Sequence, residues 1–478
     1  MPKILFISPP LSAKEMYGKL AAGGSSEALL GLCYLAAVTR KAGHETEILD
    51  MPVLGLTFDQ ALDIVIAKKP KYVGISSVTL AIRNAAKLAD MIKKKAPESI
   101  IILGGPHIAA THEEVMNKYP QFDIGVIGEG DKTIIELLDA LEKNKDLSGV
   151  KGITYRKNGS LISTARRELL EDLDLLPIPA WDLLPDIKKH YIPTAYAVNN
   201  FPSFSIVTSR GCPYMCTFCD RSVFGNRYRT HSPEYILGMI KDLYYNHGIR
   251  DIRINDDEFI VSKKRILEFC DLLMDSKMKI SWSCLGRVSS VNKEIIDKMK
   301  KAGCWQIRFG IESGSQKVLD ILKKGIRLEQ IEKAVKICKE RGMKTIGFFM
   351  MGLPLETEED LRQTIEFSLR LKLDDFKINY FAPFPGSELF SQLDKYGRLI
   401  SDSEDVHMHI KPSFIPFGLS EEVLIKYNKI AFKRFYFRIR VILGHLARIK
   451  NVTAFISMFR SFLALSSYFF RKELDANS

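Results

Sequence analysis

Three cysteines lie within eight residues, at Cys212, Cys216 and Cys219, in the spacing C-x3-C-x2-C. On one loop, three thiolates at this spacing can hold three corners of a cubane [4Fe–4S] cluster and leave the fourth iron open. A cluster that carries only electrons normally has four protein thiolates. An open iron is instead a place for chemistry, as an open position is on a catalytic metal ion. The segment therefore predicts a cluster that binds and transforms a small molecule.

Two other interpretations of this segment are a zinc loop and a group of buried thiols. A zinc site usually has a fourth ligand at a matching spacing. The nearest candidates, Asp220 and His231, do not repeat the C-x2-C pattern. Eight cysteines in 478 residues are too few for a disulfide scaffold, so we expect a reducing, cytoplasmic compartment. The other five lie in apolar segments, where packing in the core is the commoner role: Cys33, Cys270, Cys284, Cys304 and Cys338.

The cysteine spacing, with Phe218 directly before the last cysteine, resembles the radical S-adenosylmethionine (SAM) superfamily. The resemblance implies that SAM chelates the open iron and that one electron cleaves it to a 5′-deoxyadenosyl radical. Residues 255–259, 310–315, 352–357 and 382–387 resemble further elements of this superfamily, in the same order. Leu355 stands where the family pattern has glycine, so we expect the backbone of that turn to differ.

The same resemblance implies a set of residues around SAM. An acid suits the sulfonium and ammonium groups of SAM, and an arginine suits its carboxylate. We expect the SAM site to contain Tyr214, Phe218, Asp256, Asp257, Arg287, Glu312 and Ser313. Beyond the cluster, the sequence identifies no catalytic residue. We also expect an electron donor of the flavodoxin or ferredoxin type.

The segments around these motifs alternate between strand and helix patterns. Strands are expected at 204–207, 251–255, 280–284, 306–310, 344–350 and 375–380. Helices are expected at 233–245, 263–276, 293–302, 328–341 and 358–371. Six such units predict a partial (β/α)6 barrel over residues 200–400, with its active site at the carboxyl ends of the strands.

Residues 1–142 also alternate, which predicts an α/β domain with a Rossmann-like open parallel sheet. Ligands of such sheets bind beyond the carboxyl ends of the strands, and small residues there allow close approach. The layout resembles the cobalamin-binding domain that precedes many radical SAM barrels. That resemblance implies cobalamin contacts at Ser8, Pro9, Ser76, Ser77, Thr79, Gly104, Gly105, His107, Gly128, Glu129 and Gly130.

The D-x-H-x-x-G motif that ligates cobalt is absent from this domain. We therefore expect cobalamin with its lower base displaced and no histidine on cobalt. For His107, a hydrogen bond to the backbone is the alternative to ligation of cobalt. For the whole domain, the alternative is a sheet that kept the fold and lost the cofactor.

Residues 143–199 are expected to connect the two domains. They hold a hairpin around Asn158-Gly159 and then a proline-rich stretch with Trp181 as a packing anchor. Residues 401–478 are expected to form a basic helical tail, with helices at 420–443 and 452–470. From Glu421 onward there are eleven Lys or Arg against four Asp or Glu.

Basic amphipathic helices can lie on an anionic membrane surface, here the inner face. The alternative is that the tail packs over the open side of its own barrel, and both can hold. No motif supports binding to nucleic acid. The amino terminus does not resemble a signal peptide, and no uncharged apolar run is long enough to span a membrane.

The matching motifs resemble the cobalamin-binding radical SAM branch that includes the anaerobic magnesium-protoporphyrin monomethyl ester cyclase. We expect an oxygen-sensitive enzyme that methylates an unactivated carbon of a hydrophobic substrate, such as an isoprenoid lipid or a tetrapyrrole. One alternative is radical cyclisation or oxidation without methyl transfer. An alternative from another class is a cobalamin or iron–sulfur sensor without turnover. A methylthiotransferase is not expected, because that branch has three more cluster cysteines and only Cys33 precedes Cys212.

Overall fold

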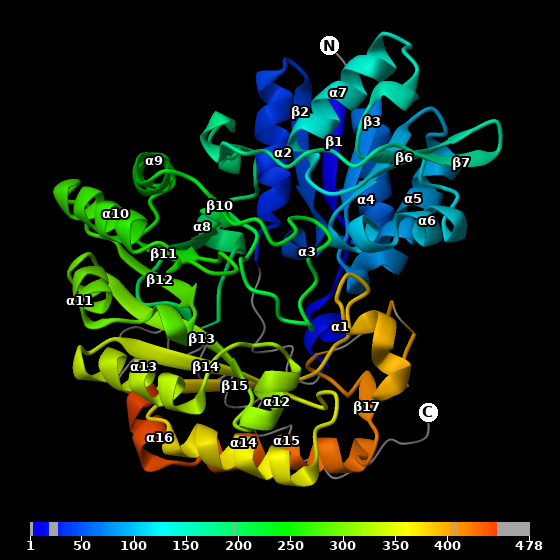
Figure 1. Cartoon of the computed structure of the whole chain (residues 1–478). Helices are drawn as coiled ribbons and strands as arrows, with labels where there is room; N and C mark the ends of the chain where they lie inside the picture. Colours follow the sequence, from blue (N-terminus) through cyan, green and yellow to red (C-terminus); the bar gives the residue numbers. More distant parts are fainter. Residues whose placement is uncertain (1–2, 19–26, 195–196, 403, 406–407, 447–478) are drawn as a thin grey trace.

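The structure is a computed structural model that describes residues 3–18, 27–194, 197–402, 404–405 and 408–446. Two sheets of mainly parallel strands dominate it, one in each half of the chain (Figure 1). The predicted α/β class, with an open sheet followed by a partial barrel, is confirmed.

The first sheet begins with five parallel strands in the order β2-β1-β3-β4-β5. They are β1 (Lys3–Ser8), β2 (Glu45–Asp50), β3 (Tyr72–Ser76), β4 (Ile100–Gly104) and β5 (Ile124–Val126). Side chains alternate between the two faces, so Ile4 and Phe6 pack on one side and Leu5 and Ile7 on the other. Helices α2 (Leu30–Lys41) and α7 (Gly130–Glu142) cover the first side. Helices α4 (Phe58–Lys68), α5 (Ile82–Lys95) and α6 (Pro106–Lys118) cover the second.

The hairpin around Asn158-Gly159 extends this sheet. Its strands, β6 (Ile153–Lys157) and β7 (Ser160–Ser163), continue the sheet beyond β5 by antiparallel pairing. Both turn residues have positive φ, as a tight hairpin turn requires. The first sheet therefore runs past residue 142, the boundary expected from the sequence.

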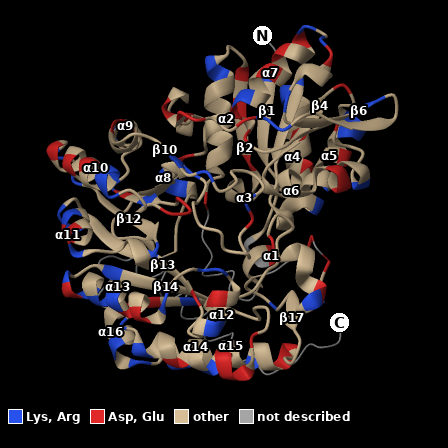
Figure 2. Ribbon diagram, viewed as in Figure 1, with Lys and Arg blue, Asp and Glu red and all other residues tan. Residues whose placement is uncertain are grey.

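The second sheet is parallel and has the order β15-β14-β13-β12-β11-β8. Its strands are β8 (Ser203–Ile206), β11 (Asp251–Ile254), β12 (Ser281–Gly286), β13 (Cys304–Glu312), β14 (Lys344–Met351) and β15 (Asp375–Tyr380). The outer face carries α9 (Pro233–Tyr245), α10 (Lys263–Asp275), α11 (Lys293–Lys301), α13 (Leu328–Glu340) and α14 (Glu358–Arg370). Figure 2 shows that most charged residues in this view lie on the helices. The order of strands and helices predicted for the barrel is confirmed.

Shorter elements join these layers. They are α1 (Ala13–Tyr17), α3 (Met51–Leu54), α8 (Ile187–His190), β9 (Ser209–Arg210), β10 (Arg229–Thr230), α12 (Gln316–Ile321), β16 (Gly397–Leu399) and β17 (Phe414–Pro416). Trp181 is buried where the domains meet, with its ring edge-on to Phe204 of β8 at 5.7 Å between centroids. It therefore has the anchoring position expected of it.

The carboxyl-terminal part begins with α15 (Glu421–Tyr436) and α16 (Ile439–Leu446), separated at Phe437. Phe435 of α15 is fully buried and stacks on Phe376 of β15 at 4.7 Å. The first tail helix thus packs over its own barrel, as one of the two alternatives expected. The predicted helix at 452–470 lies outside the described residues. In the part of the chain that is described, no helix has the length and apolarity to cross a membrane.

Leu355, which stands where the family pattern has glycine, has a left-handed backbone with φ of 60°. The side chain is 47% exposed, so little packing offsets the strain. We expect Leu355→Gly to raise the free energy of unfolding in urea by about 1 kcal/mol, because glycine adopts this conformation without strain. Leu175→Gly is the matched control, since Leu175 is 63% exposed without a positive φ. A loss of stability in both variants would contradict the prediction.

Candidate active site

The three cysteines occupy a loop beyond the carboxyl end of β8 and directly after β9. Gly211 opens the loop with φ of 80°, and a Cβ there would lie 2.3 Å from the carbonyl oxygen of Arg227. Only glycine suits this position. Thr217 fixes the middle of the loop: its amide donates to the Leu322 carbonyl, and its carbonyl accepts from the Leu389 amide, both at 3.0 Å. The loop is therefore held where barrel active sites lie.

Two cations face the thiols. Nη1 of Arg287 lies 4.0 Å from Sγ of Cys216, and its guanidinium stacks on the Tyr214 ring at 3.8 Å. A hydrogen bond from Cys219, supported by the charges of Lys324 and Arg287, lowers the pKa of Cys216 to about 6. The same hydrogen bond, together with burial, raises the pKa of Cys219. Thiolates are the ligands that iron–sulfur clusters require, so the loop fits a cluster.

The neighbouring strand end brings an acid to the same place. Glu312 ends β13 with φ of 68°, an unusual conformation for a residue other than glycine and one that is common at functional sites. Its Oε1 accepts a hydrogen bond from Nζ of Lys324 at 2.7 Å. The same Nζ lies 5.6 Å from the centre of the Phe218 ring. Arg287 and Glu312 therefore lie around the cysteine loop, to which Tyr214 and Phe218 themselves belong.

The remaining predicted SAM residues have different positions. Asp256 is buried, and its carboxylate accepts hydrogen bonds from the Thr208 amide, the Thr208 hydroxyl and the Ser209 hydroxyl at 2.5–2.7 Å. Ser313 is also buried, and its hydroxyl bonds to Thr364 at 3.1 Å. Both side chains hold backbone in place, and their contact with SAM stays a prediction. Asp257 is exposed at the strand end.

Sequence reasoning missed two charged residues at this site. Lys324 lies between α12 and α13, outside every motif. Glu258 is buried, and this burial raises the pKa of its carboxyl to about 7. The sequence did hold a signal for Glu258. It is one of four polar residues that directly follow a buried strand, and such residues are hard to place in a core.

The residues predicted to bind cobalamin lie at one edge of the first sheet. This edge faces the cysteine loop: a Cβ at Gly128 would lie 3.8 Å from the Val223 carbonyl oxygen, and Arg166 donates to the Ser222 carbonyl. A cavity of about 420 Å³ opens between the two domains. It is lined by Ala109, Ala110, His112, Ile127, Thr164, Arg166, Ser222 and Gly386.

Two loops at this edge interlock. The Ser77 amide donates to the Gly104 carbonyl at 2.9 Å, and a Cβ at Gly105, where φ is 107°, would lie 2.5 Å from the Ser77 oxygen. Nδ1 of His107 is 3.2 Å from the Thr79 hydroxyl, so the imidazole bonds to a side chain and not to the backbone. Its Nε2 is buried with no hydrogen-bond partner among the described residues, and burial lowers its pKa. The small residues and this unpaired nitrogen fit a polar planar ligand.

The other residues in the predicted cobalamin set lie beside these loops. Ser8 ends β1 and bonds to Asp50, Pro9 is buried after it, and Ser76 ends β3. Gly130 begins α7, against Leu35 of α2. All of them therefore lie at the carboxyl edge of the sheet, and their contact with cobalamin stays a prediction.

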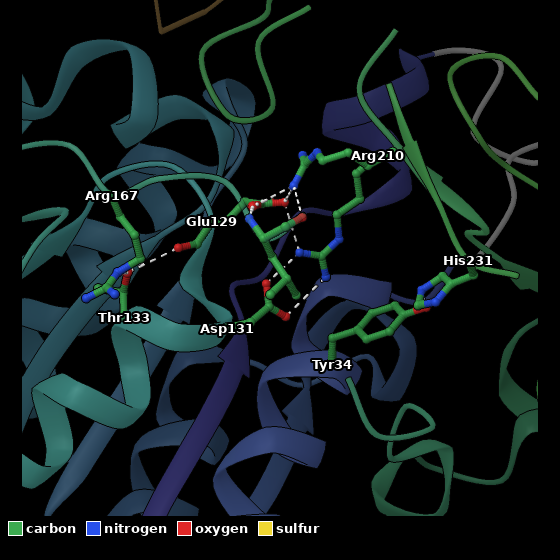
Figure 3. A network of polar contacts seen from close by, with 9 residues as sticks. Tyr34, Glu129, Asp131, Thr133, Arg167, Arg210 and His231 are labelled. Carbon is green, nitrogen blue, oxygen red and sulfur yellow. Dashed lines mark hydrogen bonds and ion pairs between the residues drawn. The ribbon is translucent and has the colours of Figure 1, made fainter. Parts of the chain in front are cut away.

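Glu129, whose predicted contact with cobalamin stays a prediction, has buried partners in both halves of the chain. Its carboxylate accepts hydrogen bonds from Arg229 at 2.9 Å and from the Leu170 amide at 2.8 Å, and it also pairs with Arg210. Arg210 makes a two-pronged contact with Asp131, at 2.6 and 3.1 Å (Figure 3). All four side chains are buried. Because Arg210 directly precedes Gly211, this inter-domain network ties the edge of the first sheet to the cysteine loop.

His231, which could have been a fourth zinc ligand, lies beside this network (Figure 3). It is buried and stacks on Tyr235 at 3.9 Å, with Nδ1 3.0 Å from Asp174 and Nε2 3.3 Å from the Tyr34 hydroxyl. Burial lowers its pKa to about 4. Among the described residues, no three His, Cys, Asp or Glu side chains converge on one point, as the ligands of a single zinc ion do. In a cubane cluster, by contrast, each thiolate binds a different iron.

Comparison with known proteins gives matches over both domains. The B12 binding domain matches residues 21–138, and the radical SAM superfamily matches residues 206–368. An uncharacterised methyltransferase of Pyrococcus horikoshii is 34% identical over 444 residues, which cover 92% of this chain and 94% of that protein. The anaerobic magnesium-protoporphyrin IX monomethyl ester cyclase of Rubrivivax gelatinosus is 30% identical over 76% of this chain and 65% of that protein.

A solved structure shares the fold across both domains. It is the cobalamin-dependent SAM radical enzyme OxsB with aqua-cobalamin and SAM bound. The TM-score is 0.74 at 19% identity, over 98% of this chain and 72% of that chain.

Proposed function

The chain belongs to the cobalamin-dependent radical SAM enzymes, and from this premise we propose that it transfers a methyl group to an unactivated carbon of a small molecule. Its cofactors are a [4Fe–4S] cluster, SAM and cobalamin. The observation that carries the proposal is the cavity between the two domains, which is lined by Ile127 directly after β5 and by Ser222 and Gly386 of the barrel. Methyl transfer to a substrate radical requires both cofactors to reach one carbon, and a cavity between the two domains supports such an arrangement.

The chain's own residues have defined parts in this proposal. Cys212, Cys216 and Cys219 would hold the cluster, which together with SAM would supply the radical that removes a hydrogen atom. Arg287, whose Nε is buried with no hydrogen-bond partner among the described residues, is placed to bind the SAM carboxylate. Glu312 is placed to accept from its ammonium group. The interlocked loops at the edge of the first sheet leave a surface on which cobalamin can lie.

Substrate and partners are the finer parts of the proposal. A hydrophobic substrate, such as an isoprenoid lipid or a tetrapyrrole, is the class expected from the resemblance. A flavodoxin or ferredoxin supplies electrons. A peripheral membrane contact through the tail is supported by the exposed apolar residues of α16, which are Ile439, Ile442, Leu443 and Leu446. Sedimentation with anionic liposomes by the full chain, but not by a chain that ends near Phe417, would support this contact.

A second candidate function is radical ring closure or oxidation without methyl transfer. The similarity to the Rubrivivax gelatinosus cyclase favours it. Product analysis separates the candidates. The protein is reconstituted anaerobically with iron, sulfide and hydroxocobalamin, reduced and given SAM, and both 5′-deoxyadenosine and S-adenosylhomocysteine are quantified by mass spectrometry. Methyl transfer predicts both products, the second candidate predicts 5′-deoxyadenosine alone, and a sensor yields neither.

Lys324 provides a test of the proposed SAM site. Lys324→Met leaves Glu312 without its ion-pair partner and removes a cation that faces Cys216. Because this ion pair holds the Glu312 carboxylate in position, its loss should raise the KM for SAM roughly tenfold or more, measured by 5′-deoxyadenosine formation over a range of SAM concentrations. Lys323→Met is the control, because Lys323 is exposed and pairs with Glu388. If neither variant changes the KM for SAM, Lys324 is not part of the SAM site.

A further inference from the structure

The inner face of the barrel sheet carries a group of cationic and polar side chains. Strand side chains alternate, so Ile252 and Trp282 face the outer helices, and the residues next to them point to the opposite, inner face. The pairing register places Arg253 between Ser205 and Ser283, while Arg308 and Lys377 lie on β13 and β15. We call Ser205, Arg253, Asn255, Ser283, Arg308 and Lys377 the lumen cluster.

Hydrogen bonds connect the lumen cluster across three strands. Nδ2 of Asn255 donates to the Ser205 hydroxyl at 3.1 Å, and Nη2 of Arg308 donates to Oδ1 of Asn255 at 3.1 Å. Glu27, which precedes α2, accepts from the Ser205 hydroxyl at 2.9 Å and pairs with Arg253. These contacts confirm that the side chains share one face, although their strands are far apart in the sequence.

Several donors in the cluster lack acceptors. Arg253 and Ser283 are at least 97% buried, and Nε of Arg253, Oγ of Ser283 and Nε of Arg308 have no hydrogen-bond partner in the described part of the chain. A buried donor without a partner is costly, and native proteins rarely retain one without a reason. The pattern indicates a site prepared for an acceptor that arrives with a ligand.

The described residues of this face include more cations than carboxylates. Arg253, Arg308 and Lys377 lie there with two carboxylates, Glu27 and Asp251. The Asp251 carboxylate already accepts hydrogen bonds from the hydroxyls of Ser203 and Ser281 and from the Asn199 amide. The Glu27 side chain is 38% exposed, so an incoming anion can displace its carboxylate from Arg253. Burial lowers the pKa of Arg308 to about 10 and that of Lys377 to about 8, which leaves both mainly protonated at neutral pH.

We propose that the lumen cluster binds an anionic group of the substrate, either a carboxylate or a phosphate. The guanidinium donors of Arg253 and Arg308 and the Ser283 hydroxyl, which have atoms without an acceptor among the described residues, suit such oxygens. Leu285 and Phe348, partly buried on the same face, offer apolar contact to the rest of the molecule. The inference rests on the proposed function, since it takes the barrel interior as the substrate site. It narrows the substrate to an amphiphilic molecule: a tetrapyrrole with carboxylates qualifies, whereas an uncharged isoprenoid hydrocarbon does not.

Binding of three aromatic probes tests the inference. The full chain, reconstituted anaerobically with its cluster and hydroxocobalamin and saturated with SAM, is titrated calorimetrically with phenyl phosphate, benzoate and benzyl alcohol. Saturating SAM fills the site that binds the SAM carboxylate, so the anionic probes cannot bind there. We expect at least one anion to bind about tenfold or more tightly than the neutral alcohol, and the better anion identifies the group. Equal affinity for all three probes would overturn the inference.

Matched variants locate the binding. Arg308→Gln should weaken binding of the preferred anion about tenfold or more and leave benzyl alcohol unchanged. Lys377→Gln tests the same site from another strand if the first variant fails to fold. Arg370→Gln is the control, because Arg370 lies on α14 with its side chain 63% exposed in an ion pair with Glu332. An equal loss in the control would overturn the inference.

The same preparation separates this inference from the proposed function. Formation of 5′-deoxyadenosine and S-adenosylhomocysteine is measured in parallel with binding. A chain that forms both products but does not prefer anions contradicts the lumen cluster alone. A chain whose lumen variants lose anion binding, but which forms neither product, contradicts the proposed function alone.

Discussion

Replacing Cys216 by alanine should reduce formation of 5′-deoxyadenosine to below about a thousandth of the wild-type rate, a loss of roughly 4 kcal/mol or more in transition-state stabilisation. Two thiolates cannot hold a cubane cluster on this loop, and the lost thiol is the one whose pKa is lowered to about 6 beside Arg287 and Lys324. The measurement is anaerobic product analysis of the reconstituted variant, together with its iron content.

The control for this prediction is Cys338→Ala. Cys338 is fully buried in α13 and belongs to the barrel core. Its replacement should lower stability but leave the iron content and the 5′-deoxyadenosine yield per folded chain near wild type. If Cys216→Ala keeps its iron and its activity, the three-cysteine loop is not the cluster site.

The inter-domain network gives the second large effect. Asp131→Asn removes the carboxylate that pairs with Arg210 at 2.6 and 3.1 Å inside the molecule. Breaking a buried ion pair leaves the remaining charge poorly compensated, so the free energy of unfolding in urea should fall by about 3 kcal/mol. Because Arg210 precedes the cysteine loop, we also expect the yield of S-adenosylhomocysteine relative to 5′-deoxyadenosine to fall. The radical forms within the barrel, whereas methyl transfer needs the two domains in their correct relative position.

Glu168→Gln is the matched control for this effect. Glu168 pairs with Lys151 on the surface, where the two side chains are 74% and 49% exposed. Surface pairs contribute little, so the change in unfolding free energy should stay within about 0.5 kcal/mol and the product ratio should not move. If Asp131→Asn behaves like this control, the network does not fix the placement of the two domains.

The order of strands and helices followed from local signals. Apolar runs, glycine turns and helix-capping residues act over a few positions, so both parallel sheets could be predicted from the sequence. The hairpin at Asn158-Gly159 was recognised, but its pairing with β5 was not. Strand pairing is a tertiary property that local pattern does not encode.

The roles of individual polar residues were harder to predict for the same reason. Glu129 has its partners, Arg210 and Arg229, 81 and 100 residues further along the chain. The carboxylate of Asp256 is likewise occupied by groups 47 and 48 residues away. A motif indicates that an acid is present at a strand end, but not whether it faces a ligand or a buried neighbour. The three cysteines escaped this ambiguity because their spacing on one loop is itself the signal.

The claim that the chain binds both a cluster and cobalamin is tested most directly by the metal content of one anaerobically reconstituted sample after gel filtration. A chain that holds a cluster on the cysteine loop and cobalamin at the edge of the first sheet should retain about four iron atoms and about one cobalt atom. Cys216→Ala should lose the iron and keep the cobalt, because the two sites lie on different domains. If cobalt separates from the wild-type chain on gel filtration, the first domain does not hold cobalamin as proposed.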